Sequence, residues 1–290
     1  MRNQNIDQCW QFQHGLYDEF PDAEKAKSIR EVNLPHDYMI ESNVSESAAS
    51  GPASGYYTQG VAYYTKLIDI PQEWEQEVVY LHFDGIMMNA TVDINGCKAI
   101  LQHNGYIPFS VNITPYLYFG KKNRVTITVA PSMQPNSRWY SGAGIFRSIE
   151  LLHMPKLHIA SDGIFGYTKS IEYDTLGNPV CAYLHTEVAY LNLTLENPEL
   201  WDVENPNIYK LHARVTDLGV FKTHFVPSEK NTTDETSVLF GVKTITADVK
   251  HGLRINGKTV KLKGGCIHHD NGMLGAVSLY DAELLMPGEL

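Results

Sequence analysis

Residues 124–129 read Arg-Val-Thr-Ile-Thr-Val, and their alternation decides the fold class. Side chains two positions apart on a strand point to the same face, so Val125, Ile127 and Val129 share one apolar side. The residues between them face the other way. The pattern predicts a half-buried β-strand, with one face on a core and the other in water.

Similar short runs of β-branched and aromatic residues follow one another along the chain, separated by turn signals. Asn95-Gly96 and Asn256-Gly257 supply the positive φ values of tight hairpin turns, the second inside a hairpin over 252–262. Long helical periodicity is missing, and only residues 11–30 and 276–285 could carry short helices. The chain is therefore expected to be mainly β. Further strands are expected at residues 78–83, 90–94, 148–152, 157–159, 183–188, 210–215 and 237–240, with a polar loop at 228–236.

The charge balance argues against several classes of partner. Lys and Arg total 23 against 33 Asp and Glu, a net charge of -10 over 290 residues. No basic surface for phosphate backbones is expected, so nucleic acid is not an expected partner. No apolar run approaches the ~18–20 residues of a membrane span. The first residues also lack the apolar segment of a signal peptide, and we expect no membrane partner.

The four cysteines, Cys9, Cys97, Cys181 and Cys266, are far apart in the sequence. Without a CxxC or paired spacing, they predict neither a disulfide framework nor a zinc site. Together with the missing signal peptide, they favour a reducing, cytoplasmic location. Gly-rich phosphate loops, nucleophile elbows and zinc signatures are absent from the sequence, so we expect no cofactor and no metal.

Three stretches, taken together and in this order, resemble glycoside hydrolase family 2, the family of β-galactosidases, β-glucuronidases and β-mannosidases. The resemblance covers nearly the whole chain, and its most specific part is the loop that ends in Gly-Ile-Phe-Arg147. That loop and the His-His-Asp-Asn-Gly turn are most similar to the β-galactosidase branch. The stretches are Leu34-Pro-His-Asp37 with Phe83-Asp-Gly85 and the Asn95-Gly96 hairpin, then Asn136-Ser-Arg-Trp-Tyr-Ser-Gly-Ala-Gly-Ile-Phe-Arg147 with Ile149-Glu-Leu151, then Phe240-Gly-Val-Lys-Thr-Ile245 through His268-His-Asp270.

The resemblance implies three domains. Residues 1–155 would form a sugar-binding jelly roll, 156–250 a shortened immunoglobulin-like β-sandwich, and 251–290 the start of a truncated (β/α)₈ barrel. The sandwich would be short because residues 186–190, similar to an early strand of the family, run directly into residues 191–195, similar to a late one. The barrel would be truncated because such a barrel needs about 250 residues.

The resemblance places no catalytic residue in this chain. Retaining glycosidases need two carboxyl groups ~5–5.5 Å apart, one as acid/base and one as nucleophile. In the family both are Glu on late barrel strands, and the acid/base follows an Asn. No Asn-Glu dipeptide occurs in the sequence, and after residue 251 the only glutamates are Glu283 and Glu289. We therefore expect the chain alone to be inactive.

Three residues are candidates for carbohydrate binding. His268 matches the family's His at the end of the first barrel strand, where it helps to bind sugar hydroxyls, and strand ends on that barrel face meet ligands. Arg138 and Trp139 lie in the loop that reaches toward the barrel mouth in the family. Some members have a sugar-contacting acidic residue near the position of Arg138, and Trp139 could equally pack against the jelly roll. The run His268-His-Asp270 is not expected to bind a metal, because three consecutive strand residues cannot all face one ion.

His36 and Asp37 look like a catalytic pair on paper. Neighbours on an extended strand point to opposite faces, so a structural role is expected for both.

Two hypotheses about function follow. The first is a β-galactosidase-type glycoside hydrolase, represented here by a part without the catalytic glutamates. The second is a non-catalytic carbohydrate-binding or structural β-sandwich fragment. The two hypotheses are distinguished by the catalytic glutamate pair, which a hydrolase needs and a binding or structural fragment does not. The expected partner is a β-galactoside or a related oligosaccharide, and a homo-oligomer is left open.

Overall fold

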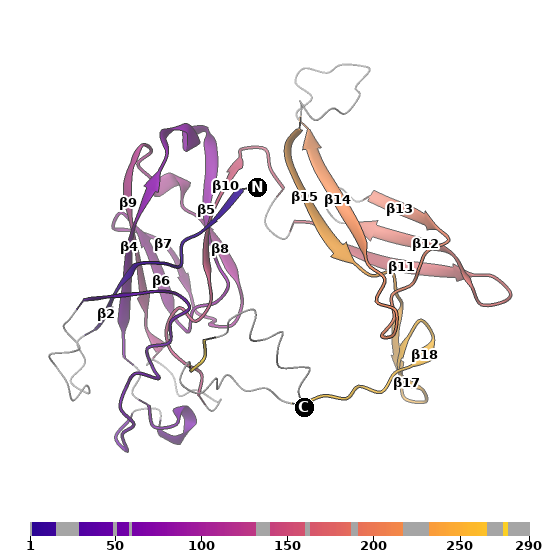
Figure 1. Ribbon diagram of the computed structural model, residues 1–290, viewed down its shortest axis with the longest axis horizontal. Coiled ribbons are helices and arrows are strands. Elements are labelled where there is room, and N and C mark those ends of the chain that lie inside the picture. The colour runs from indigo at the N-terminus through magenta and orange to yellow at the C-terminus, as the bar shows by residue number, and fades with distance from the viewer. Residues whose placement is uncertain are drawn as a thin grey trace. The chain divides into compact units, whose positions relative to one another are not determined.

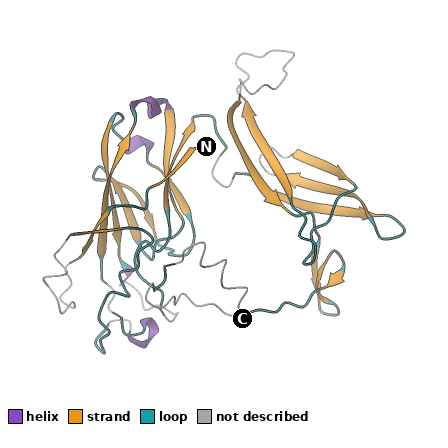
Figure 2. Cartoon of the chain, in the orientation of Figure 1, coloured by secondary structure: helices purple, strands orange, loops and turns teal. Residues whose placement is uncertain are grey.

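A computed structural model of the chain describes residues 2–15, 29–48, 51–57, 60–131, 140–159, 163–186, 191–216, 232–265 and 275–277. Strands dominate these residues, which confirms the mainly β prediction (Figures 1 and 2). The chain divides into two compact units. The first contains residues 2–154 together with the segment 275–277, and the second contains the described residues from 155 to 265. No helix in these ranges has the length and apolar character needed to cross a membrane.

Two sheets build the first unit, one with the order β1-β10-β5-β8 and one with the order β3-β2-β4-β9-β6-β7. Short 3-10 helices at Gly51–Ser54, Gln72–Gln76 and Thr114–Tyr116 lie between strands. The strands are β1 (Arg2–Asn5), β2 (Trp10–His14), β3 (Arg30–Val32), β4 (Ala62–Ile70), β5 (Glu77–Phe83), β6 (Ala90–Ile94), β7 (Cys97–Gln102), β8 (Phe109–Asn112), β9 (Lys121–Val129) and β10 (Ile149–Pro155).

The inward faces of both sheets share one hydrophobic core. Val125, Ile127 and Val129 of β9 are fully buried, as the alternation predicted. Leu81 and Phe83 of β5 enter the same core from the other sheet. The first unit is thus a sandwich in which each sheet buries its apolar face against the other.

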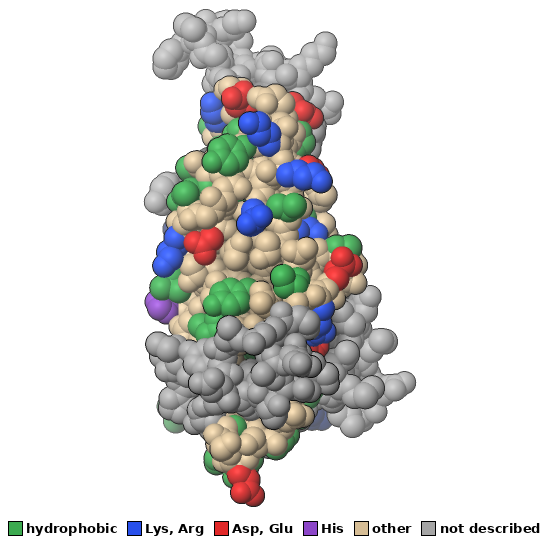
Figure 3. Space-filling model, turned by 90° about the vertical axis from the view of Figure 1, so that its left-hand side faces the viewer, with side chains coloured by type: hydrophobic (Ala, Val, Ile, Leu, Met, Phe, Trp, Pro, Cys, Tyr) green, Lys and Arg blue, Asp and Glu red, His purple; other side chains and the backbone are tan. Residues whose placement is uncertain are grey.

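The outer face of the larger sheet carries polar residues together with exposed Tyr63 and Leu67. The strand register places Thr65 of β4 beside Thr126 of β9, and Thr126 beside Asp93 of β6. Figure 3 shows the molecule from this side, where hydrophobic side chains are scattered among charged ones. One face on a core and one in water is the usual arrangement of an antiparallel sheet.

The second unit has shorter sheets and a smaller core. Its buried apolar cluster, within the described residues, consists of Ala182, Leu184 and Val242, with a few partly buried side chains around them. The strands are β11 (Gly166–Tyr173), β12 (Pro179–Thr186) and β13 (Leu191–Glu196) in one sheet, β14 (Tyr209–Thr216) and β15 (Thr232–Phe240) in a second, and β16 (Ile245–Asp248), β17 (Gly252–Ile255) and β18 (Lys258–Thr259) in a third.

Both Asn-Gly hairpins are confirmed. Asn95 and Gly96 have φ values of 52° and 84° between β6 and β7, and Asn256 and Gly257 have 50° and 79° between β17 and β18. Positive φ at both central residues is the signature of the tight turn that the dipeptide predicted.

Three local predictions were wrong. In the segment 11–30, which could have carried a short helix, residues 11–14 belong to strand β2 and residue 30 begins β3, because Trp10 and Phe12 alternate into the core. Residues 157–159 form no strand, since the chain bends after β10 and leaves Leu157 exposed. Residues 232–236, expected in a polar loop, pair with β14 as the first half of β15. Most of the two helix candidates, 16–28 and 278–285, lies outside the described residues.

Amide hydrogen exchange should be faster in the second unit than in the first, because fewer buried contacts must open to expose its backbone. We expect the amides of β12 and β14 to exchange at least ~10-fold faster than those of β5 and β9, a difference of about 1.4 kcal/mol in opening free energy. Exchange followed by mass spectrometry measures this. Equal protection in the two units would contradict this, because it would show that the small core stabilises the second unit as well as the large core stabilises the first.

Candidate functional site

The three predicted carbohydrate-binding residues lie outside the described residues. Arg138 and Trp139 fall in segment 132–139, and His268 falls in segment 266–274. The structure describes the residues that follow each segment in sequence, Tyr140 and Gly275. Both belong to the first unit, and they meet at one buried side chain, Asp37.

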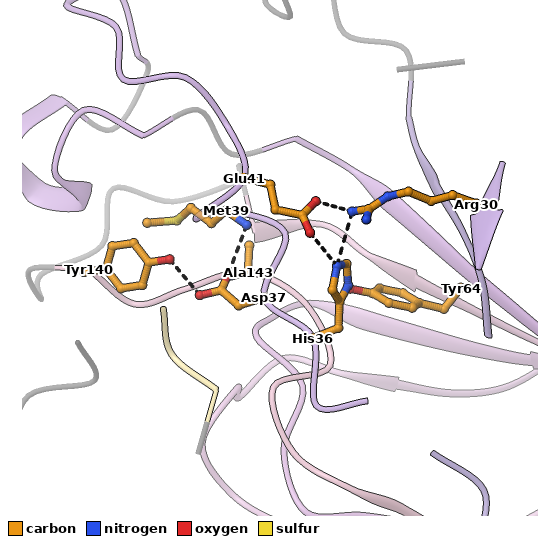
Figure 4. Close-up of polar contacts among 8 residues, drawn as sticks. All are labelled: Arg30, His36, Asp37, Met39, Glu41, Tyr64, Tyr140 and Ala143. Atoms are coloured by element: carbon orange, nitrogen blue, oxygen red, sulfur yellow. Dashed lines mark hydrogen bonds and ion pairs between the residues drawn. The ribbon is translucent and has the colours of Figure 1, made fainter. Parts of the chain in front are cut away.

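Asp37 is only 3% exposed, and its carboxylate accepts four hydrogen bonds. Oδ1 accepts from the backbone N–H groups of Met39 at 3.0 Å and Ala143 at 2.9 Å. Oδ2 accepts from the Tyr140 hydroxyl at 2.7 Å and from the Ala276 N–H at 2.8 Å (Figure 4 shows the contacts of Met39, Tyr140 and Ala143). Burying a carboxylate is costly unless such charge-assisted bonds replace its water, and here they do.

Two glycines allow the chain to approach Asp37 this closely. Gly142 and Gly275 have φ values of +71° and +61°, which residues other than glycine rarely adopt. A Cβ on Gly142 would lie 2.9 Å from Asp37 Oδ2, and a Cβ on Gly275 would lie 2.3 Å from the same atom. The glycines therefore fit the loops around the carboxylate.

Backbone hydrogen bonds hold the loop after Tyr140 in place. His36 N–H donates to Ile145 O at 2.7 Å, and Tyr38 N–H donates to Ala143 O at 2.9 Å. Gly144 and Met87 exchange two further bonds, each of 2.9 Å. The chain that enters this loop from segment 132–139 is thus fixed against the sandwich from residue 140 onward.

His36 belongs to a second network beside Asp37. Its Nδ1 lies 2.8 Å from the Tyr64 hydroxyl and its Nε2 lies 3.2 Å from Glu41 Oε1. Glu41 also pairs with Arg30. Burial acts to raise the pKa of Glu41, but the contacts with His36 and Arg30 outweigh it and hold that pKa below its usual value. His36 and Asp37 thus contact different partners, as predicted for neighbours on an extended chain (Figure 4).

The contacts of Asp37 with the described residues are all structural bonds within the protein, so the carboxylate orients three chain segments. The sequence predicted a structural role for Asp37 but not these partners. Leu34-Pro-His-Asp37 and the Gly-Ala-Gly of residues 142–144 were its signal, but the bond to Ala276 spans 239 positions and cannot be read without the fold. In the described part of the chain no three His, Cys, Asp or Glu side chains are placed to hold a metal ion, and the run from His268 to Asp270 lies outside it.

Replacing Asp37 should destabilise the first unit. In Asp37→Ala, three buried N–H groups and one hydroxyl lose their acceptor, and we expect a loss of about 3 kcal/mol or more in the free energy of unfolding. Urea denaturation measures it. Asp84 is a matched control, because its carboxylate is 45% exposed and pairs with His82 at 3.2 Å, and Asp84→Ala should cost about 1 kcal/mol or less. Equal losses in the two variants would contradict the role of Asp37.

His14 should make the first unit less stable in mild acid. Burial lowers its pKa from 6.5 to about 4, against a raising effect of Glu41. In the unfolded chain His14 is protonated below about pH 6.5. In the folded chain it is protonated only below about pH 4. The free energy of unfolding therefore falls as the pH is lowered through this window.

In a His14→Gln variant the free energy of unfolding should fall less between pH 6.5 and pH 4. Urea denaturation at a series of pH values measures it. His103→Gln, which removes an exposed histidine, should leave the profile unchanged. An identical profile for wild type and His14→Gln would exclude His14 as the cause.

Two family models match the sequence in separate stretches. The model described as the sugar binding domain of glycosyl hydrolases family 2 matches residues 5–155. The model described as glycosyl hydrolases family 2 matches residues 166–243.

The chain is also similar to curated glycosidases and to solved structures of glycosyl hydrolase family 2 members. A β-galactosidase of Bacteroides ovatus is 31% identical over 283 residues, which cover 85% of this chain and 32% of the relative. A putative β-glucuronidase of Formosa agariphila is 28% identical over 93% of this chain and 28% of the relative. A crystal structure of a glycosyl hydrolase family 2 member from Bacteroides cellulosilyticus matches 98% of this chain and 40% of that one, with a TM-score of 0.76 and 27% identity.

The chain spans about a third of the length of these curated relatives. One family model alone covers more than half of its residues, and the order of the matched parts is that of the resemblance found in the sequence. The chain belongs to glycoside hydrolase family 2.

Proposed function

We propose that the protein is a glycoside hydrolase of the β-galactosidase type, which cleaves O-glycosidic bonds in β-galactosides or related oligosaccharides. The observation that carries the proposal is the meeting of Tyr140 and Ala276 at Asp37. It fixes the chain directly after the two segments that contain Arg138, Trp139 and His268. These three residues are our candidates for carbohydrate binding.

The finer architecture is part of the proposal. We assign the first sandwich to a jelly roll, the second unit to a shortened immunoglobulin-like sandwich, and the residues after 251 to the start of a barrel. The small core of Ala182, Leu184 and Val242 supports a shortened second domain. The free thiols of Cys9, Cys97 and Cys181 suit the expected cytoplasmic location.

We also propose that these 290 residues do not hydrolyse glycosides by themselves. Hydrolysis with retention needs an acid/base and a nucleophile, and general acid–base assistance alone contributes ~10²–10⁴-fold. The sequence has no Asn-Glu dipeptide to supply the family's acid/base. The alternative is a chain that only binds carbohydrate or only supports structure.

A β-glucuronide is the second candidate substrate, for two reasons. Arg138 stands where some family members have a sugar-contacting acidic residue, and a guanidinium suits the carboxylate of a uronic acid. The similarity to a putative β-glucuronidase of Formosa agariphila points the same way. The β-galactoside remains the first candidate because of the loop over residues 139–147 and the similarity to the Bacteroides ovatus protein.

Chromogenic β-galactoside and β-glucuronide assays on the purified chain test the proposal of inactivity. We expect no turnover above a buffer blank with either substrate. Turnover well above the blank that also disappears in His268→Ala would show a working site in this chain and would overturn the proposal.

Binding of the unreacted sugars, followed by intrinsic fluorescence, tests the three candidate residues. A β-galactoside should shift the emission of the wild type but not of Trp139→Ala or His268→Ala. Tyr118→Ala, which removes a 59% exposed ring, is the control and should bind as the wild type does. Stronger binding of the glucuronide that depends on Arg138 would reverse the order of the two substrates.

A further inference from the structure

The outer face of the β11-β12-β13 sheet combines tyrosine rings with polar groups. The strand register places Tyr167 opposite His185 and Ser170 opposite Tyr183, so these side chains share one face. Side chains of the opposite face, such as Ala182 and Leu184, enter the core of the second unit. The tyrosines therefore point away from that core.

Two ring contacts on this face link β11 to β12. Phe165, Tyr167 and Tyr183 are 57%, 42% and 36% exposed. The ring centroids of Phe165 and Tyr167 are 5.7 Å apart, and those of Tyr167 and His185 are 5.2 Å apart. Tyr183 lies two positions before His185 on the same face of β12.

Oxygen acceptors lie beside the rings. The Tyr183 hydroxyl donates to Glu172 Oε1 at 3.1 Å, which fixes the direction of that ring. On the neighbouring strand β13, Thr194 lies opposite Tyr183, and Glu196 lies opposite Cys181. Thr194 and Glu196 are both exposed.

We propose that this surface, formed by Phe165, Tyr167, Tyr183, Glu172, Thr194 and Glu196 and here called the tyrosine face, binds a neutral oligosaccharide. Exposed ring faces suit the C–H faces of pyranose rings, because an aromatic side chain offers apolar area at small entropic cost. The carboxylates accept hydrogen bonds from sugar hydroxyls. That the ligand is a carbohydrate rests on the proposed function. The tyrosine face is independent of Arg138, Trp139 and His268.

Charge decides which carbohydrates the tyrosine face accepts. Glu172 and Glu196 place two negative charges on it, and the whole chain carries a net charge of -10. Uronate-rich or sulfated chains are repelled by like charge.

Affinity electrophoresis of the 290-residue chain in native gels tests the inference. One gel contains neutral galactan, a second contains polygalacturonate, and a third contains no polysaccharide. Galactan should slow the migration of the wild type in the gel, and polygalacturonate should not. The double variant Tyr167→Ala/Tyr183→Ala should weaken binding to galactan about tenfold or more, since two stacked rings are lost.

Two further variants separate the rings from other effects. Tyr167→Phe/Tyr183→Phe keeps both rings and should still bind galactan more tightly than the alanine pair. Tyr118→Ala should migrate as the wild type does. Circular dichroism of each variant checks that it is folded, which we expect because both tyrosines lie outside the core.

Several outcomes would overturn the inference. Both polysaccharides could slow the migration of the wild type equally, or galactan could leave its migration unchanged. Galactan could also slow the Tyr167→Ala/Tyr183→Ala variant as much as the wild type. A dimer that dissociates in the alanine pair would assign the face to contact between copies of the chain. If galactan binding depends on Trp139 and His268 but not on the tyrosines, the proposed function stands and the tyrosine face fails. If binding depends on the tyrosines alone, the tyrosine face stands and Trp139 and His268 fail as binding residues.

Discussion

The buried carboxylate of Asp37 joins three stretches of chain that lie far apart in the sequence. It accepts hydrogen bonds from the residue two positions on, from Tyr140 and Ala143 in the loop before β10, and from Ala276. A buried acceptor of this kind is costly to leave unsatisfied, so each donor is held in place by the others. The glycines at 142 and 275 show how closely the backbone surrounds it. The loop over residues 140–143 and the segment 275–277 depend on this one group for their arrangement.

The two units differ in how they are stabilised. The first buries aromatic and branched side chains from both sheets around Trp10, Phe83 and Ile127, and such a core can hold loops and a buried charge in fixed positions. The second relies on a few small contacts around Ala182 and Leu184 and presents rings on its outer face. The first unit therefore has the core that can hold loops rigidly, and the second presents exposed rings.

The sequence predicted the mainly β class and the family, because alternation and Asn-Gly turns are local signals that carry over directly into strands and hairpins. Val125, Ile127 and Val129 were placed on the core face correctly. Strand β4 was not predicted, although it lies in the middle of its sheet, because Tyr63, Thr65 and Leu67 face outward between buried residues and hide the pattern. A structural role was predicted for Asp37, but its partners were not, because they are set by the fold of the whole unit.

Asp37 holds segment 275–277 against the rest of the first unit. The exchange rate of the Ala276 backbone amide proton, measured by NMR, tests it most directly, since that proton is buried in a bond to Oδ2 at 2.8 Å. We expect protection similar to that of the Ala143 amide, which donates to Oδ1 of the same carboxylate. Exchange of the Ala276 amide as fast as that of the fully exposed turn residue Val249 would contradict it.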